Sequence, residues 1–493
     1  NAPAGALFYG DKGVSRQFTQ NSPWQFTPNL RLSFDPIGDG KSVIRAGAEL
    51  AYDEPNWFTG QRVQQNPPFA TTISQTQTSS SGPLSFTSPW SAGSITYNPF
   101  PQPLIPTPAL AVFYPQSEYV VLPNQFHPAR TMQWTLSVQH EFLRGWQAQI
   151  DYIGNATRHD PLGTPFNQAV FIPGVWGPNG AGCAGIVRTG PAAVKPGAAG
   201  TNCSTVGNQN SRLALTIANP LQGNQYLGGG GGSVVVGVGA TASYNGMVST
   251  LQHRLSSTFS LLANWTWSKC LNIADASGDI SGTPTENPHN PKMDWGPCGS
   301  DYRDIENILV VAKSDFKSFN RAERLLFNNW EIAPLIHIQS GGPVNVSAGQ
   351  DNSLTHVGND RPNLVPGVNP YNKVAFRKAS GEANREYLNP AAFAQVTAPC
   401  GTNLNGCPEL GTYGDIRRNS FRSPPSLQFD SQISRIFPIH DRLAMDLRLE
   451  AFNVLNHPDF GGPSGSLTSS TFGQISGTAN SARVFQGAIK LSF

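Results

Sequence analysis

Residues that could perform acid–base or metal chemistry are scattered through this sequence rather than grouped in known catalytic patterns. The sequence contains no HExxH, GxSxG or Walker A arrangement, the spacings used by zinc proteases, serine hydrolases and P-loop proteins. The run Gly228–Gly232 could cradle a phosphate, but no strand–turn–helix pattern surrounds it. We interpret this run as a flexible loop, and predict neither an enzyme active site nor a bound cofactor.

One histidine has acidic neighbours that a metal ion could use. His289 is followed by Asp294, Asp301 and Asp304, and imidazole with carboxylates is a common ligand set for divalent metals. The same residues also suit a solvated loop, which needs no metal. We favour the loop and predict no metal site.

A second group of charges alternates strictly with apolar residues. Arg442, Asp446, Arg448 and Glu450 are separated by Leu443, Met445, Leu447 and Leu449. Two close carboxylates could act as acid and base, but their alternation with leucines places all the charges on one face of a strand. We therefore predict a row of charges that faces a water-filled lumen.

Aromatic side chains in long connecting segments could stack against a ligand. Six residues are candidates for such contacts: Trp57, Phe58, Trp90, Tyr97, Trp176 and Trp295. Packing within the loops is the alternative for each of them.

The six cysteines fall into three local pairs. These pairs are Cys183 with Cys203, Cys270 with Cys298, and Cys400 with Cys407. None forms a CxxC motif, and their neighbours are mainly Gly, Asn, Pro and Thr rather than core residues. We predict three disulfides, which implies an oxidising compartment.

Composition excludes several classes of protein. Only 13% of the residues are charged and the net charge is +2, too weak for a surface that binds nucleic acid. Aromatic residues make up 10% of the chain, which argues against disorder. No apolar run is long enough for a transmembrane helix, and the mean hydropathy is −0.29. Membrane β-strands remain compatible with this mean hydropathy, because only every second residue of such a strand faces the lipid and needs to be apolar.

The strongest signal is alternation of apolar and polar residues with a period of two, which indicates β-strands. It extends over segments longer than the usual strand of about 5–6 residues, and matches the length of about 9–11 residues of a tilted membrane strand. The predicted strands are 24–36, 41–54, 129–141, 145–157, 242–255, 258–271, 304–316, 328–350, 424–437, 442–455 and 482–493.

Short and long connections alternate between these strands. The short ones are 37–40, 142–144, 256–257, 317–327 and 438–441, and the long ones are 55–128, 158–241, 272–303, 351–423 and 456–481. This asymmetry is typical of outer-membrane barrels, which have short periplasmic turns and long external loops. The fold class predicted is therefore all-β, a transmembrane antiparallel up-and-down β-barrel with about 11 or 12 long strands. An odd count leaves the first and last strands parallel, so we expect this chain to be part of a longer barrel.

Several short motifs, in order along the chain, resemble those of Oar-like TonB-dependent transporters. The motifs are DGKSVIRAG (Asp39–Gly47), SYN (Ser243–Asn245), WTWSK (Trp265–Lys269), QSGGP (Gln339–Pro343), DRPNL (Asp360–Leu364), LNPAAF (Leu388–Phe393), AFNVLNHP (Ala451–Pro458) and KLSF (Lys490–Phe493). The resemblance implies a barrel of about 22 strands with an N-terminal plug. On this view residues 1–493 form the C-terminal portion of the barrel, and the plug and a small regulatory-like domain lie outside it.

The resemblance also implies partners and an assembly signal. A TonB-type inner-membrane complex would act through the missing plug, and the barrel-assembly machinery would recognise the C-terminal strand. The residues of that signal alternate along the last strand: Phe485, Gly487, Ile489, Leu491 and Phe493. The function expected is uptake of a large or scarce solute across the Gram-negative outer membrane. A passive porin-like barrel and a secreted adhesive β-protein are the alternatives.

Overall fold

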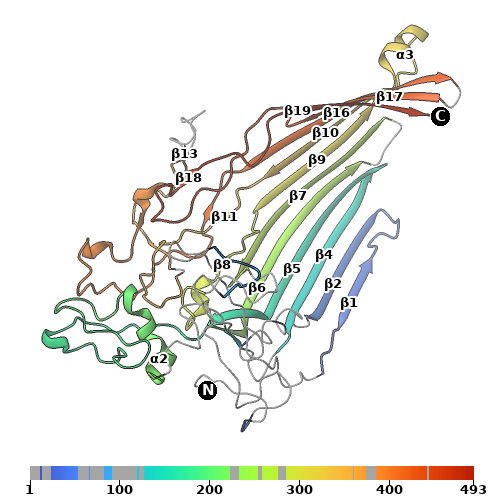
Figure 1. The fold of residues 1–493 in the computed structure, drawn as a ribbon. Coiled ribbons are helices and arrows are strands. Elements are labelled where there is room, and N and C mark those ends of the chain that lie inside the picture. The colour runs from blue at the N-terminus through green and yellow to red at the C-terminus, as the bar shows by residue number, and fades with distance from the viewer. Residues whose placement is uncertain are drawn as a thin grey trace.

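A computed structural model describes most of the chain. The described residues are 11–13, 24–53, 61, 66, 83–90, 119–121, 127–221, 233–253, 258–275, 285–358, 360–372, 385–440 and 443–493. Figure 1 shows one broad, twisted sheet of long strands, with the irregular segments gathered beyond one end of it.

Within the described residues the large sheet has 13 strands, and its main path follows chain order. The strands of this path are β1 (Asn29–Phe34), β2 (Ser42–Asp53), β4 (Ala129–Leu143), β5 (Trp146–Pro165), β6 (Ser233–His253), β7 (Phe259–Asn272), β9 (Asp304–Lys313), β10 (Trp330–Gln339), β16 (Ser426–His440), β17 (Leu443–Phe452) and β19 (Val484–Ser492). Each pairs antiparallel with its neighbours. The predicted all-β, antiparallel fold with long strands is confirmed.

The remaining elements are short. β3 (Tyr119–Val121) pairs parallel with β6, and β8 (Gly296–Pro297) pairs with β7. Three two-stranded ladders lie in the loops: β11 (Pro343–Val344) with β15 (Phe421–Arg422), β12 (Asn363–Leu364) with β14 (Phe393–Ala394), and β13 (Arg385–Glu386) with β18 (Gln474–Ile475). The helices are η1 (Pro178–Gly180), η2 (Val206–Arg212), α2 (Ala214–Ala218), η4 (Pro291–Asp294), α3 (Arg321–Phe327), η5 (Pro390–Ala392) and η6 (Ala398–Cys400).

The registers of neighbouring strands keep the apolar residues in line. Residues directly opposite one another in a ladder lie on the same face. Ile433 is opposite both Leu449 and Ile332, and Ile332 is in turn opposite Ala312. In the first half of the sheet, Val138 is opposite both Ile44 and Ile150. We call the face that carries these residues the apolar face.

Side chains on the apolar face are exposed in this chain, although they are large and hydrophobic. Met132, Ile150 and Leu449 expose about half of their surface, at 55%, 54% and 49%. Such a broad apolar surface on a sheet marks contact with another apolar phase.

The opposite face, which we call the polar face, is lined by hydrogen-bonded polar side chains. The His337 ring contacts the Asn307 carbonyl oxygen at 2.7 Å, and the Asn307 amide donates to Asn264 at 3.0 Å. Arg448 lies on this face between Asp446, at 3.2 Å, and Glu450, at 3.7 Å. Arg442, the fourth predicted member of the charge row, lies outside the described residues.

Two predicted segments differ from the structure. The segment 328–350 does not form one bent strand: β10 ends at Gln339, and Pro343–Val344 forms the separate β11. A Cβ on Gly341 would lie 1.7 Å from the Ser423 carbonyl oxygen, so this glycine lets two backbones meet where the strand stops. The segment 158–241 is not all loop, because β5 extends to Pro165 and β6 begins at Ser233. The connection 317–327, which was predicted to be short, contains the helix α3.

Pro334 lies inside a strand, and the structure shows how the sheet accommodates it. Residues Ile332 and Leu335 pair with β9 in one common register, but Ala333 and Pro334 between them do not pair with it. On the other side the ladder from β10 to β16 continues through Pro334. Because proline has no N–H to donate, only the β9 side of the ladder is interrupted.

The assignment of the two faces predicts opposite responses to a buried charge. Replacing Leu447 on the apolar face, Leu447→Arg, should cost about 2–4 kcal/mol if the site lies near the membrane midplane. Replacing Gln428 on the polar face, Gln428→Arg, should change stability little, since Asp430 lies beside it. Urea titration of the refolded variants in lipid measures both changes, and equal losses would contradict the assignment of faces.

Candidate functional site in the loop assembly

The long connections pack together at the end of the sheet opposite the short turns (Figure 1). We call the described parts of 166–221, 273–303, 340–425 and 453–483 the loop assembly. Its centre is an apolar cluster that includes Val346 and Leu388, both completely buried. Phe393 packs edge-on against Phe421 at 5.1 Å and Phe472 at 5.2 Å, and thereby joins two of the segments. The loops therefore have a core of their own, separate from the sheet.

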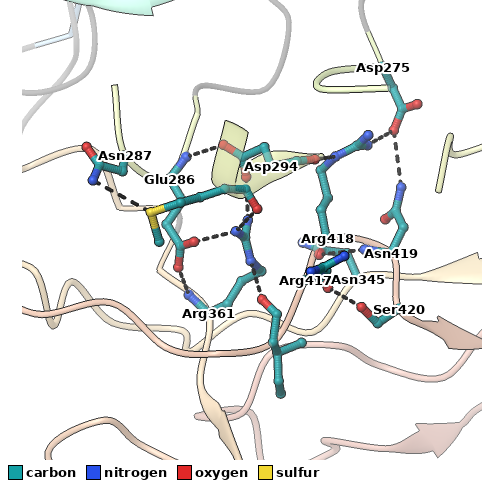
Figure 2. A network of polar contacts seen from close by, with 12 residues as sticks. Asp275, Glu286, Asn287, Asp294, Asn345, Arg361, Arg417, Arg418, Asn419 and Ser420 are labelled. Atoms are coloured by element: carbon teal, nitrogen blue, oxygen red, sulfur yellow. Dashed lines mark hydrogen bonds and ion pairs between the residues drawn. The ribbon is translucent and has the colours of Figure 1, made fainter. Parts of the chain in front are cut away.

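Buried arginines connect segments that are distant in sequence, as Figure 2 shows. The Arg361 side chain, 4% exposed, contacts the carboxylates of both Glu286 and Asp294. Its Nε donates to the Ile416 carbonyl at 2.8 Å, and its backbone N–H donates to Glu286 at 2.7 Å. One guanidinium thus joins the segment 273–303 to two stretches of the segment 340–425.

A second arginine fixes the loops to the sheet. Arg418 pairs with Asp275 and donates to the main-chain carbonyl of Asn272, the last residue of β7, at 2.9 Å. Its Nε also donates to the carbonyl oxygen of Asp294 at 3.1 Å, so Arg361 and Arg418, both drawn in Figure 2, share this residue.

Asp301 forms a third junction at the same strand. Its carboxylate pairs with Arg303 and Arg422, and accepts a hydrogen bond from the Cys270 backbone N–H at 2.6 Å. The disulfide between Cys270 and Cys298 closes the same corner.

The environment of Arg361 shifts the titration of its acidic neighbours. Burial raises the pKa of the Glu286 carboxyl to about 7, although Arg361 acts in the opposite direction. Burial also raises the pKa of Asp360 to about 6. Desolvation is the main cause for both carboxyls, and nearby carboxylates add to it, Asp294 and Asp360 for Glu286 and Asp351 for Asp360.

A further buried arginine joins the loop after β5 to the segment around Leu354. Arg212 is completely buried and donates to four oxygens, among them the Val170 carbonyl at 2.6 Å and the Leu354 carbonyl at 3.3 Å. Asn202 links the same loops farther out, since its amide donates to the Leu404 carbonyl at 2.6 Å.

All three predicted cysteine pairs are disulfide bonded. Cys183–Cys203, Cys270–Cys298 and Cys400–Cys407 have Cα separations of 5.2, 5.4 and 5.8 Å. These distances fall in the ordinary range for a bridge. Each disulfide closes a loop within the assembly or joins it to β7.

The structure places the predicted ligand-contacting aromatics differently from one another. Trp176 is 3% exposed, packs on the Cys183–Cys203 disulfide and has Arg188 over its ring at 5.0 Å, which favours loop packing for this residue. Trp295 packs against a small cluster at the end of β5 and β6. Trp90 is partly exposed, whereas Trp57, Phe58 and Tyr97 lie outside the described residues.

Of the four residues weighed as metal ligands, two are held in ion pairs, and Asp304 accepts a hydrogen bond from the Trp265 indole at 3.3 Å. Asp294 and Asp301 bind arginines, and His289 is exposed. Among the described residues, metal-ligand spacing is found only for Cys400, Cys407 and Glu409, whose two sulfurs are already bonded to each other. The run Gly228–Gly232 lies outside the described residues.

Sequence reasoning missed the buried arginines as joints of the loop assembly. Arg361 was visible within the DRPNL motif, but its partners lie 75 and 67 residues away. The sequence does show arginines next to Pro, Asn and Ser in the long connections. That pattern does not reveal which residues these arginines contact.

Comparison with known proteins identifies the family to which the fold belongs. A family model described as "Outer membrane beta barrel domain" matches residues 1–486. No curated protein matches the chain. In the described part of the chain, none of the helices has the length and apolar character needed to cross a membrane.

Three solved structures illustrate what the chain is similar to. The transporter YddB from Escherichia coli is 9% identical, with 94% of this chain and 40% of that chain covered and a TM-score of 0.41. The ferric enterobactin receptor PfeA from Pseudomonas aeruginosa, a variant in complex with enterobactin, is 10% identical, with 95% and 40% covered and a TM-score of 0.42. The pyoverdine receptor FpvA from Pseudomonas aeruginosa is 10% identical, with 94% and 36% covered and a TM-score of 0.36. The chain therefore spans about two fifths of the length of these structures.

The joint at Arg361 predicts a large effect of its removal. Arg361→Ala leaves Glu286 and Asp294 buried without a counter-charge, which should destabilise the loop assembly by about 3–5 kcal/mol. Hydrogen exchange of the segment 285–297 in the folded protein measures this loss. The matched control is Arg417→Ala, which removes an exposed arginine and should change stability by less than about 0.5 kcal/mol. Equal exchange in the two variants would contradict the role assigned to Arg361.

Proposed function

The chain belongs to the family of outer membrane β-barrel domains, and we propose that it is the C-terminal part of the barrel of a TonB-dependent-type transporter or receptor. The family locates the chain in the Gram-negative outer membrane, which its strands cross. The proposed activity is uptake of a large or scarce solute.

The observation that carries this proposal is the preorganised loop assembly. Three disulfides, an aromatic core and buried arginines hold the loops in one arrangement before any ligand arrives. Rigid loops favour selective binding because less conformational entropy is lost when the ligand binds. Selective capture at the outer mouth is what an active transporter requires. The ordered motifs that resemble Oar-like transporters support the same proposal.

In this proposal the polar face lines the lumen and the apolar face contacts lipid. Asp446, Arg448 and Glu450, together with the undescribed Arg442, would present charges to the passing solute. The energy-coupling partner would be a TonB-type inner-membrane complex, acting through a plug outside residues 1–493.

Two other functions remain as alternatives. A passive porin-like barrel would use the same two faces of the sheet but need no selective loop assembly. A secreted adhesive protein would have no use for a continuous apolar face, and membership of an outer-membrane family speaks against it. Experiment must therefore distinguish the proposed transporter from the first alternative, a passive porin-like barrel.

Conductance of the full-length protein in a planar lipid bilayer tests active transport against passive passage. A plugged transporter should give almost no steady current, whereas a porin gives a large one. The purified protein should also bind the periplasmic domain of TonB. A large ohmic conductance with no TonB binding would contradict the proposal and support the porin.

The last strand supports a proposed role in assembly. β19 pairs with β17, and within the described residues it has no neighbour on its other side. Phe485, Ile489, Leu491 and Phe493 are 62%, 68%, 57% and 97% exposed. Gly487, which carries no side chain, falls between Phe485 and Ile489 on the same face. An edge in lipid leaves backbone groups unsatisfied at several kcal/mol each, so such a strand must be paired during insertion.

Deletion of Phe493 from the full-length protein should greatly reduce the amount that reaches the outer membrane. The reason is that the barrel-assembly machinery would lose the aromatic end of its proposed signal. The control is a shortened loop 456–481, which leaves the strand intact and should allow insertion. Outer-membrane fractionation and immunoblotting measure both, and wild-type levels of the Phe493 deletion would show that the terminus is no assembly signal.

A further inference from the structure

The connection between β9 and β10 differs from the other short turns because it contains a helix. In α3 the Asn320 side chain accepts a hydrogen bond from the Glu323 N–H at 2.9 Å, and the Asn320 N–H donates to the Glu323 carboxylate at 3.0 Å. This capping box fixes the first turn. The helix ends at Phe327, and Asn329 follows with a φ of 63°, which returns the chain to β10. A short, capped helix is thus built into this end of the sheet.

Two contacts show on which side of the sheet the helix lies. The Trp330 indole donates to the Leu326 carbonyl at 2.9 Å, and the Arg435 guanidinium donates to the Leu325 carbonyl. Trp330 and Arg435 are opposite one another in the β10–β16 ladder, and Arg435 is opposite Leu447 in the next ladder. Both therefore belong to the apolar face. The last turn of α3 is held at the edge of the apolar face and not over the polar face.

The side chains at this end of α3 are apolar and face water in the isolated chain. Leu325, Leu326 and Phe327 are 73%, 60% and 54% exposed. Three consecutive exposed apolar residues are unusual on a soluble surface. They adjoin Trp330, which is partly exposed and stacks with Arg435 at 5.1 Å. The patch is therefore continuous with the lipid-facing surface of the barrel wall.

Basic residues lie on the same connection. Lys317, Arg321 and Arg324 are exposed, and within the described part of the chain none of them pairs with a carboxylate. Of the two acidic residues there, Glu323 is engaged in the helix cap. Exposed cations beside an apolar patch match the chemistry of a membrane interface, where phosphates lie just above the acyl chains.

We propose that α3 is an interfacial anchor that inserts Leu325, Leu326 and Phe327 into the periplasmic leaflet of the outer membrane. Lys317, Arg321 and Arg324 then contact the phosphates of anionic glycerophospholipids. The anchor fixes the depth of the barrel wall at β9 and β10. This inference rests on the barrel fold and the periplasmic side of the short turns, and not on the proposed transport activity.

A fluorescent probe on α3 tests the proposal in the full-length protein. All six cysteines within residues 1–493 are in disulfides, so Leu326→Cys adds one free thiol to this part of the chain for an environment-sensitive dye such as NBD. Any free cysteine outside these residues is replaced by serine in all variants. The labelled protein is reconstituted in vesicles of phosphatidylethanolamine and phosphatidylglycerol. We expect a blue-shifted emission, and loss of most of the signal when lipids carry a spin-label quencher just below the headgroup. The matched control is Asp39→Cys in the exposed polar turn between β1 and β2, which should stay unshifted and weakly quenched.

A charge variant separates headgroup recognition from simple apolar contact. Arg321→Glu with Arg324→Glu should reduce quenching of the probe at position 326 in vesicles with phosphatidylglycerol. The reduction should be smaller in vesicles of phosphatidylcholine alone, which carry no net charge. Equal loss in both lipids would overturn the role of anionic phosphates.

Two results would overturn the anchor itself. One is equal quenching of the probes at positions 326 and 39. The other is a blue shift in native outer membranes that is absent in vesicles of pure lipid, since a protein partner would then cover the helix. Leu326 is exposed, so the substitution leaves the packing of the sheet intact and keeps both readouts interpretable.

Discussion

The structure depends first on the pairing of backbone groups where no water is available. In lipid each unpaired N–H or C=O costs several kcal/mol, so every strand must be matched to its neighbours over the whole width of the membrane. The registers show this constraint: the shifts within them fall near strand ends, at Glu141/Leu143 and Pro438/His440 by the short turns and at Arg158/Asp160/Leu162 by the loops. Between these ends the registers stay fixed. A fixed register is also what keeps the apolar face continuous, since a slip by one residue would turn every side chain to the other face.

The loop assembly is free of that constraint and is stabilised by different interactions. Its ladders have two residues per strand, and irregular backbone is held by side chains instead. Arg361 contacts two carboxylates and two main-chain carbonyls, those of Ile416 and Met293. Burying such charges contributes little net stability, but a misplaced loop would leave them unpaired. Buried ion pairs therefore select one arrangement of the loops, and the aromatic core and disulfides supply the stability.

The parts of the fold that the sequence predicted are those decided by near neighbours. Alternation between adjacent residues is enough to identify a strand and its two faces, as in Leu443–Phe452. The disulfides could be predicted for a similar reason, because each joins cysteines at most 28 residues apart in the sequence. The contacts between Arg212 and Leu354, or Arg418 and Asp275, span more than 140 residues, and no local pattern encodes them. The helix α3 was missed because seven residues are too few to show a helical period, although its capping residues Asn320 and Glu323 were visible.

Specific contacts join the loop assembly to the large sheet. At β7 the joints are the Cys270–Cys298 disulfide, the Asp301 carboxylate and the contact of Arg418 with Asn272. At β16 the Leu427 N–H donates to Asp459, and Asp430 accepts from the Asn453 N–H, both at 2.8 Å. Asp430 belongs to the polar face, because it is opposite Leu335 and its neighbour Phe429 is opposite Ile336 of the apolar face. These two hydrogen bonds join the segment 453–483 to β16, and through Asp430 they reach the polar face of the sheet. The loop assembly is thus joined to the polar face by hydrogen bonds at β16, and to the ends of β5 and β6 by the apolar cluster that Ile273, Ala274 and Trp295 form with Leu162 and Ala240.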